Sequence, residues 1–167
     1  MLLMKIGAIA GFVTLVGCSA VGTDSLTPSP GNRVMQSGEI AANDPSQSIL
    51  TAISGQGTGR VIVAPTAKDD GTFSAEITIN VHDAAPNTTF LVQRAPDLVP
   101  DGVCTGTYKK NVGVTLTTDS TGAGDTHFFF ERGSPFFSGV RFDVVFQVYT
   151  PDLSTILQSE CMTVTVK

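Results

Sequence analysis

The sequence predicts an all-β fold, a two-sheet antiparallel sandwich of about seven or eight strands, immunoglobulin-like in size. From residue 48 onward, short β-branched and aromatic stretches are separated by turn residues. The 17 Gly, 9 Pro and 15% charged residues favour many turns over long helices. No window past residue 48 shows the i, i+3, i+4, i+7 apolar spacing of a helix. A small barrel is the alternative architecture.

The strands are predicted from alternation and turn signals. In chain order they are expected at 48–53, 59–64, 73–82, 88–94, 111–117, 125–132, 140–149 and 156–166. Segments 73–82 and 140–149 alternate strictly, which predicts one buried face and one face in water for each. Turns are expected at 69–71, 85–87, 122–124 and 151–152, where Asp, Asn, Gly and Pro gather.

The chain divides into a leader, a linker and one domain. Residues 1–17 carry a positive charge at Lys5 and then an apolar run of eleven residues, 6–16, typical of an export signal. That run is shorter than the roughly 20 residues that a membrane-spanning helix needs, so cleavage is expected. Residues 18–47 are rich in Ser, Pro, Gly, Asn and Asp and are interpreted as a flexible tether. The domain is expected at 48–167.

The end of the apolar run, Leu15-Val16-Gly17-Cys18, resembles the lipobox of bacterial lipoproteins. The resemblance implies cleavage before Cys18, a diacylglycerol on its sulfur and often an acyl chain on its amine. Two or more chains anchor a protein stably, at about 0.8 kcal/mol per buried methylene. By the same resemblance, Ser19 points to the outer membrane in a Gram-negative host; otherwise the outer face of the cell membrane is expected. The alternative is an ordinary signal peptide with Cys18 there by chance.

The tether also has an alternative. A strand or short helix within it could dock on the domain through Val34, Met35 and Ile40.

Two cysteines remain after Cys18, and an exported protein permits their oxidation. A Cys104–Cys161 disulfide is therefore expected, stabilising the fold by about 4 kcal/mol through chain entropy. Cys161 shares the phase of Thr163 and Thr165, which places the bridge on an outer face or sheet end rather than in the core. Free thiols or a thiolate metal site are the alternatives, and the absence of CxxC spacing disfavours the metal.

Charge and motifs exclude several function classes. Fifteen acidic against ten basic residues, a formal charge of −5, disfavour a nucleic-acid partner. The sequence holds no Walker A, HExxH or GxSxG motif, so we expect neither enzyme nor cofactor nor metal. His82 and His127 each lie near an Asp on a solvent-facing position, which we interpret as coincidence. Residues 119–125 have oxygen ligands that suit calcium without EF-hand spacing and are read as a hairpin turn.

Phenylalanines form the remaining unusual feature. In Phe128-Phe129-Phe130, period two turns Phe129 outward, and Phe136 and Phe137 follow Pro135 on a connecting loop. We interpret Phe129, Phe136 and Phe137 as a candidate partner-binding surface. The alternative is that these rings pack locally or plug the end of the sandwich. The proline-stiffened loop 95–102 is a second candidate for recognition.

These observations predict a membrane-anchored envelope lipoprotein that acts as a non-enzymatic binding or scaffolding module. Its expected partners are membrane lipid, through acylated Cys18, and another envelope protein. The alternative is a carbohydrate- or small-ligand-binding β-sandwich; the absence of Trp and the presence of only Tyr108 and Tyr149 weigh against a sugar platform. An enzyme with a dispersed site is a third class, which no motif recommends.

Overall fold

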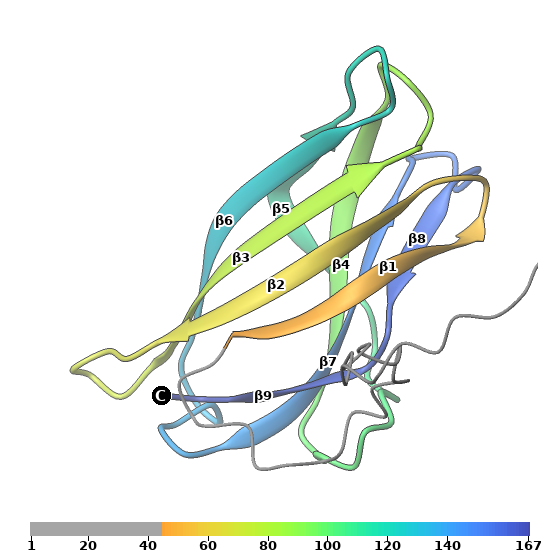
Figure 1. Cartoon of the computed structure of the whole chain (residues 1–167). Helices are drawn as coiled ribbons and strands as arrows, with labels where there is room; N and C mark the ends of the chain where they lie inside the picture. Colours follow the sequence, from red (N-terminus) through yellow and green to blue (C-terminus); the bar gives the residue numbers. More distant parts are fainter. Residues whose placement is uncertain (1–44) are drawn as a thin grey trace, which may run out of the picture. The chain divides into compact units, whose positions relative to one another are not determined.

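The computed structural model describes residues 45–167, and every structural statement below concerns that part of the chain. It contains no helix, and so no span that could cross a membrane as one. The strands are β1 (Ser46–Ser54), β2 (Thr58–Thr66), β3 (Phe73–His82), β4 (Thr89–Asp97), β5 (Lys109–Thr117), β6 (Gly124–Arg132), β7 (Arg141–Tyr149), β8 (Ile156–Ser159) and β9 (Met162–Thr165) (Figure 1). The all-β prediction is confirmed. The predicted leader and most of the predicted tether lie outside the described residues.

The strands form one curled antiparallel sheet rather than two separate sheets. Hydrogen bonds run without interruption along the order β5-β4-β7-β8-β1-β2-β3-β6. The predicted division into two sheets is corrected because β1 pairs with β2 on one side and with β8 on the other. We call β6-β3-β2-β1 the front limb and β5-β4-β7-β8 the rear limb; Figure 1 shows the front limb crossing before β4, β5 and β7.

The core lies between the two limbs. Phe73 on β3 meets Phe142 on β7 edge to face, with ring centroids 5.3 Å apart, although these strands are not neighbours in the sheet. The inward residues predicted for β3 are all buried, namely Phe73, Ala75, Ile77, Ile79 and Val81. The curl thus buries the inner faces of both limbs against one another.

The last predicted strand, 156–166, is interrupted. Its first part, β8, pairs with residues 147–149 of β7, and its second part, β9, pairs with residues 141–144. Between them the Ser159 hydroxyl accepts a hydrogen bond from the Phe146 amide, and the Glu160 amide donates to the Ser48 hydroxyl. Side chains therefore satisfy the backbone where the ladder breaks, which periodicity alone does not reveal.

β7 is buried on both faces, and the prediction that one of its faces meets water was wrong. Residues 142–149 are all buried, including Asp143 and Gln147. The segment between β4 and β5 covers the outer face: the Gly102 amide donates to Asp143, and the Tyr108 hydroxyl donates to Gln158 beside Gln147. The polar residues that suggested exposure are instead hydrogen-bonded beneath this cover.

A disulfide also holds the segment between β4 and β5 in place. Cys104 and Cys161 are bonded, with Cα atoms 5.6 Å apart, and both are half-buried. The predicted pairing is present, at the β8–β9 junction rather than in the core. Asp143, with no exposed surface, also accepts a hydrogen bond from the Thr163 hydroxyl, which ties β7 to β9.

Candidate functional site

An apolar pocket opens where the curled sheet fails to close. β5 and β6 are the two ends of the strand path, and no ladder of hydrogen bonds joins them within the described residues. The pocket, of about 260 Å³, lies between β4, β6 and β7. Apolar residues from both limbs line its interior: Val63, Phe73, Ile77, Phe130, Phe136, Phe142, Val144 and Phe146. The gap therefore gives solvent access to the inner face of the fold.

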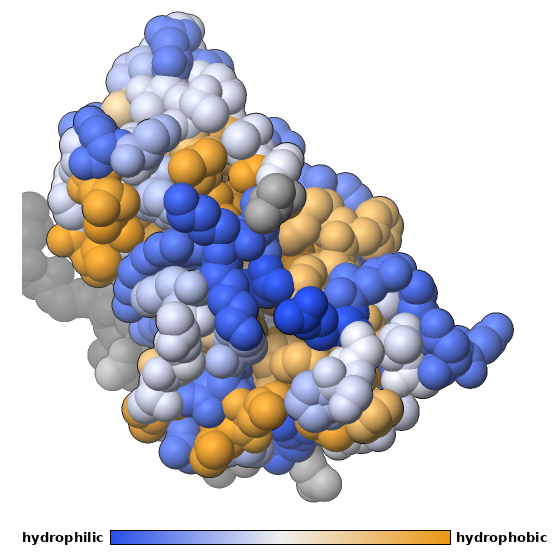
Figure 2. All heavy atoms as spheres, turned by 180° about the vertical axis from the view of Figure 1, so that it is seen from behind, coloured by the Kyte–Doolittle hydropathy of each residue, from blue (hydrophilic) through white to orange (hydrophobic). Residues whose placement is uncertain are grey.

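Three cations also line this pocket. Arg94 comes from β4, Lys109 from β5 and Arg132 from β6, and the lining includes no carboxylate. Arg94 and Lys109 are direct cross-strand partners, so their side chains share a face. Seen from behind, in Figure 2, strongly hydrophilic surface lies directly beside apolar surface. The pocket combines an apolar interior with a positive rim.

The strand period turns both arginines toward the pocket. On β4, Phe90 and Val92 are buried in the core, and Arg94 is the next residue in the same phase. On β6, Phe128 and Phe130 pack against the core, and Arg132 follows them in phase. Each arginine thus occupies an inward position near one end of its strand.

Arg94 is held in an unusual environment for a cation. Its guanidinium lies 3.8 Å from the centroid of the Phe130 ring. Burial, with a smaller contribution from the charge of Arg132, lowers the pKa of Arg94 to about 10. Among the described residues, carboxylates lie against Lys68 (Glu131), His82 (Asp83) and His127 (Glu76), and none lies against a cation of the pocket.

The proline-stiffened loop 95–102, a predicted recognition element, borders the pocket. Pro96 and Leu98 line it, and Leu98, Val99 and Val103 are exposed. The Asp97 carboxylate accepts hydrogen bonds from the Val99 amide and from the Thr105 amide and hydroxyl. The loop is therefore held in place at the rim.

The three candidate phenylalanines do not share one surface environment. Phe129 is 65% exposed on β6, with its ring against that of His127, and Phe137 is 55% exposed. Phe136 instead turns inward, with its ring centroid 4.9 Å from that of Phe142 and 6.1 Å from that of Phe73. Phe136 thus forms part of the pocket wall, while the other two face solvent.

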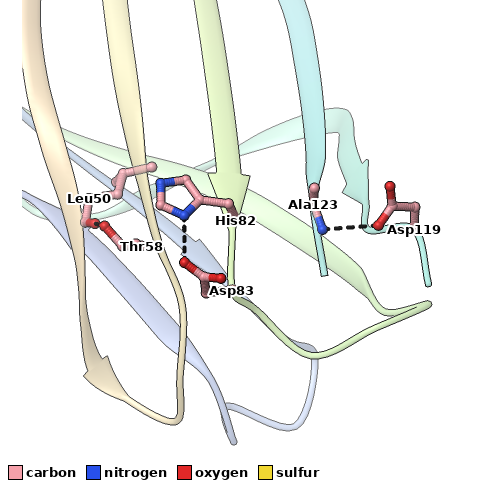
Figure 3. Close-up of polar contacts among 6 residues, drawn as sticks. All are labelled: Leu50, Thr58, His82, Asp83, Asp119 and Ala123. Atoms are coloured by element: carbon pink, nitrogen blue, oxygen red, sulfur yellow. Dashed lines mark hydrogen bonds and ion pairs between the residues drawn. The ribbon is translucent and has the colours of Figure 1, made fainter. Parts of the chain in front are cut away.

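The histidines and the acidic turn stand apart from the pocket lining. His82 contacts Asp83 at 2.7 Å (Figure 3), and His127 contacts Glu76 at 2.7 Å. His127 lies opposite Thr78 in the ladder, so His82 is about 13 Å further along β3. The Asp119 carboxylate accepts hydrogen bonds from the Ala123 amide (Figure 3) and from the Thr121 amide, as in a hairpin turn. No group of three or more potential metal ligands occurs within 45–167.

The pocket was not predicted, but a signal for it exists in the sequence. Arg94 follows the apolar residues 90 and 92 in the inward phase of its strand. Arg132 follows the apolar residues 128 and 130 in the same way. Arg94 is half-buried and Arg132 is exposed, and a charged residue in the inward phase of a strand is uncommon, so such a position indicates a site. Cys18 lies outside the described residues. Comparison of this chain with models of known protein families, with curated proteins and with solved structures finds no match.

Proposed function

We propose that this protein is a non-enzymatic ligand-binding lipoprotein of a bacterial envelope, whose β-domain takes a small ligand into the pocket between its limbs. The observation that carries the proposal is the pocket itself, apolar within and open at the gap between β5 and β6. A small-ligand module was the alternative function at the level of sequence, and the pocket now favours it over a pure scaffold.

The size of the pocket supports a ligand rather than a packing defect. Protein interiors hold few voids larger than a water molecule, which takes about 30 Å³ of liquid. The 260 Å³ here is several times that and lies just below the usual range of small-molecule sites. A sugar is disfavoured, because the interior is lined by phenylalanine and aliphatic residues instead of the hydrogen-bonding groups that hydroxyls require.

The anchor is the second part of the proposal. Acylated Cys18 holds the protein at a membrane, and the tether that follows has a root-mean-square reach of roughly 30 Å. The domain would then sample ligands near the membrane surface while its pocket stays clear of the headgroups. The support for this part is the lipobox-like sequence Leu15-Val16-Gly17-Cys18.

Methyl NMR tests the pocket. The full-length chain carrying Cys18→Ala, which has no acyl groups of its own, is titrated with octanol as a neutral apolar probe. We expect saturable shifts at Ile77 and Val144, which line the pocket, and none at Val81 and Leu157, which are buried elsewhere. Spectra that neither octanol nor octanoate changes, or equal shifts at all four residues, would rule out a binding pocket.

Fractionation tests the anchor. The unmodified protein is expected to stay with the membrane after a high-salt wash, and Cys18→Ala to be released. A Cys18→Ala variant that remains with the membrane would refute the lipid anchor.

A second candidate function is recognition of an envelope protein through Phe129 and Phe137, which are 65% and 55% exposed. In-cell cross-linking of the tagged protein would test it. The double variant Phe129→Ser/Phe137→Ser should lose the partner, whereas Ile49→Ser/Ile53→Ser, at comparably exposed positions of β1, should keep it. Equal recovery of the partner with both double variants would end this proposal.

A further inference from the structure

We propose that the pocket binds an amphipathic carboxylate, a single apolar tail of medium length that ends in one carboxyl group, of which a medium-chain fatty acid is the model. This inference rests on the proposed ligand-binding function and adds the chemical class of the ligand. The carboxylate meets Arg94, Lys109 and Arg132, and the tail enters among the phenylalanines.

The three cations line the pocket without a carboxylate beside them in its lining, although Arg132 also borders a second cavity that Asp70 and Glu131 line. Arg94 and Lys109 stand directly opposite one another on adjacent strands, an arrangement that costs stability when the charges are alike. Arg132 adds a third positive charge that acts on Arg94. Acidic residues outnumber basic ones in the chain, 15 to 10, yet none lines the pocket. An anionic ligand would supply the missing negative charge.

Arg94 is suited to a carboxylate in particular. Its guanidinium packs against the face of the Phe130 ring, and that contact leaves the N–H donors, which lie in the guanidinium plane, free to form a fork. Within the described residues no ion pair occupies its nitrogens, and none of them is among the buried side-chain atoms that lack a hydrogen-bond partner. A planar carboxylate can accept two parallel hydrogen bonds from such a fork.

The apolar lining of the pocket interior determines that the end of the ligand away from the carboxylate is apolar. Phe73, Phe142, Val144 and Phe146 offer no hydrogen bonds from their side chains, so a second polar group placed there would lose its solvation. The 260 Å³ of the pocket is well above the space that one water molecule needs, so it has room for an apolar chain of several atoms. That capacity matches one tail of medium length, with its carboxyl group at the open rim.

Calorimetric titration with three probes of equal tail length tests the inference. The full-length chain carrying Cys18→Ala is titrated with octanoate, octanol and octylammonium, and acetate serves as the head group without a tail. We expect octanoate to bind at least about tenfold more tightly than octanol, because a charge-assisted hydrogen bond exceeds a neutral one by that order. Octylammonium should bind more weakly than octanol, and acetate more weakly than octanoate. Among the three eight-carbon probes, added salt should weaken the binding of octanoate alone.

Variants assign the effect to the rim. Arg94→Met should lower octanoate affinity by about tenfold and leave octanol affinity nearly unchanged. Arg60→Met and Arg141→Met, at exposed positions outside the pocket, are the matched controls and should bind octanoate as the parent does.

The outcomes distinguish a failure of the carboxylate assignment from a failure of the proposed ligand-binding function. Equal binding of octanoate and octanol, or equal loss of both in Arg94→Met, overturns the carboxylate assignment while the pocket function stands. Failure of every probe to shift Ile77 and Val144 overturns both.

Discussion

The guanidinium of Arg94 on β4 lies 3.8 Å from the centroid of the Phe130 ring on β6, although the two strands are not hydrogen-bonded neighbours. The contact therefore spans the gap between the rear and front limbs, where the sheet stays open. It places a half-buried cation at a boundary of the pocket that no strand pairing closes.

Arg94 is expected to cost stability in the unliganded protein. Arg94→Met keeps a linear side chain against Phe130 but removes a half-buried charge that forms no ion pair within the described residues. We expect the free energy of unfolding to rise by up to about 1 kcal/mol, since functional positions often trade stability for binding. Urea denaturation of parent and variant measures it. A loss of more than about 1 kcal/mol would make the Arg94–Phe130 contact structural rather than functional.

The disulfide should contribute a large part of the domain's stability. Cys104 and Cys161 are 57 residues apart, and a loop of that length constrains the unfolded chain by about 4 kcal/mol. Cys104→Ala/Cys161→Ala should therefore unfold at lower urea, with a loss of about 2–4 kcal/mol. Reduction of the parent is the control and should give a similar loss. Unchanged stability in both would show that the loop is already fixed by its hydrogen bonds.

Asp143 should also hold in place the segment between β4 and β5, which the disulfide links to the β8–β9 junction. Its carboxylate is fully buried and accepts hydrogen bonds from the Gly102 amide and the Thr163 hydroxyl, each at 2.6 Å. Asp143→Ala leaves both donors without a partner, so we expect a loss of about 3 kcal/mol. Asp125→Ala, at an exposed position of β6, is the control and should change stability by less than about 0.5 kcal/mol. Similar losses in the two variants would deny Asp143 a special role.

Local patterns predicted the strands but not how the sheet is connected. The alternation of 73–82 was sufficient to assign the apolar core residues of β3, although Ser74, on the face expected in water, is buried as well. The alternation of 140–149 predicted a face in water that is in fact buried, because the segment between β4 and β5 folds back over the outer face of β7. Such a cover depends on long-range contacts, which no local period encodes.

The candidate site was harder to predict for the same reason. The sequence drew attention to phenylalanines by their number, yet only the fold distinguishes Phe136, which faces the pocket, from Phe129 and Phe137, which face solvent. Arg94 and Arg132 are far apart in the chain and meet only because the sheet curls. Their inward phase was visible in the sequence, but the gap that lets solvent reach them was not.

Gly122 should be irreplaceable in the turn between β5 and β6. It has a φ of +82°, and an added Cβ would come within 2.2 Å of the Ala84 carbonyl oxygen. Both the left-handed backbone and the close approach penalise any side chain. We expect Gly122→Ala to lose at least about 2 kcal/mol by urea denaturation.

Gly133 provides the matched control for this substitution. It has no atom within 4 Å of an added Cβ and no positive φ, so Gly133→Ala should be neutral or slightly stabilising. A Gly122→Ala variant as stable as Gly133→Ala would show that the turn can rearrange without cost.

Acid should weaken the fold through its loop carboxylates. The Thr150 side chain, followed by the Ser154 amide and hydroxyl, lowers the pKa of Asp152 from 3.8 to about 2. The pKa values of Asp70, Asp97 and Asp119 are lowered in the same direction, chiefly by the hydroxyls of Thr72, Thr105 and Thr121. Because each carboxyl binds its proton less readily when folded, its stabilising contribution is present above about pH 4 and is lost as the pH falls toward 2.

Urea midpoints measured from neutral pH down to about pH 2 test this expectation, with the steepest decline below pH 4. Asp152→Asn keeps an oxygen acceptor for Ser154 but has no proton to gain, so its midpoint should start lower at neutral pH and decline less in acid. Parallel profiles for parent and variant would show that Asp152 titrates alike in the folded and unfolded chains. A convergence of the two profiles near pH 2 would instead assign part of the acid sensitivity to this turn between β7 and β8.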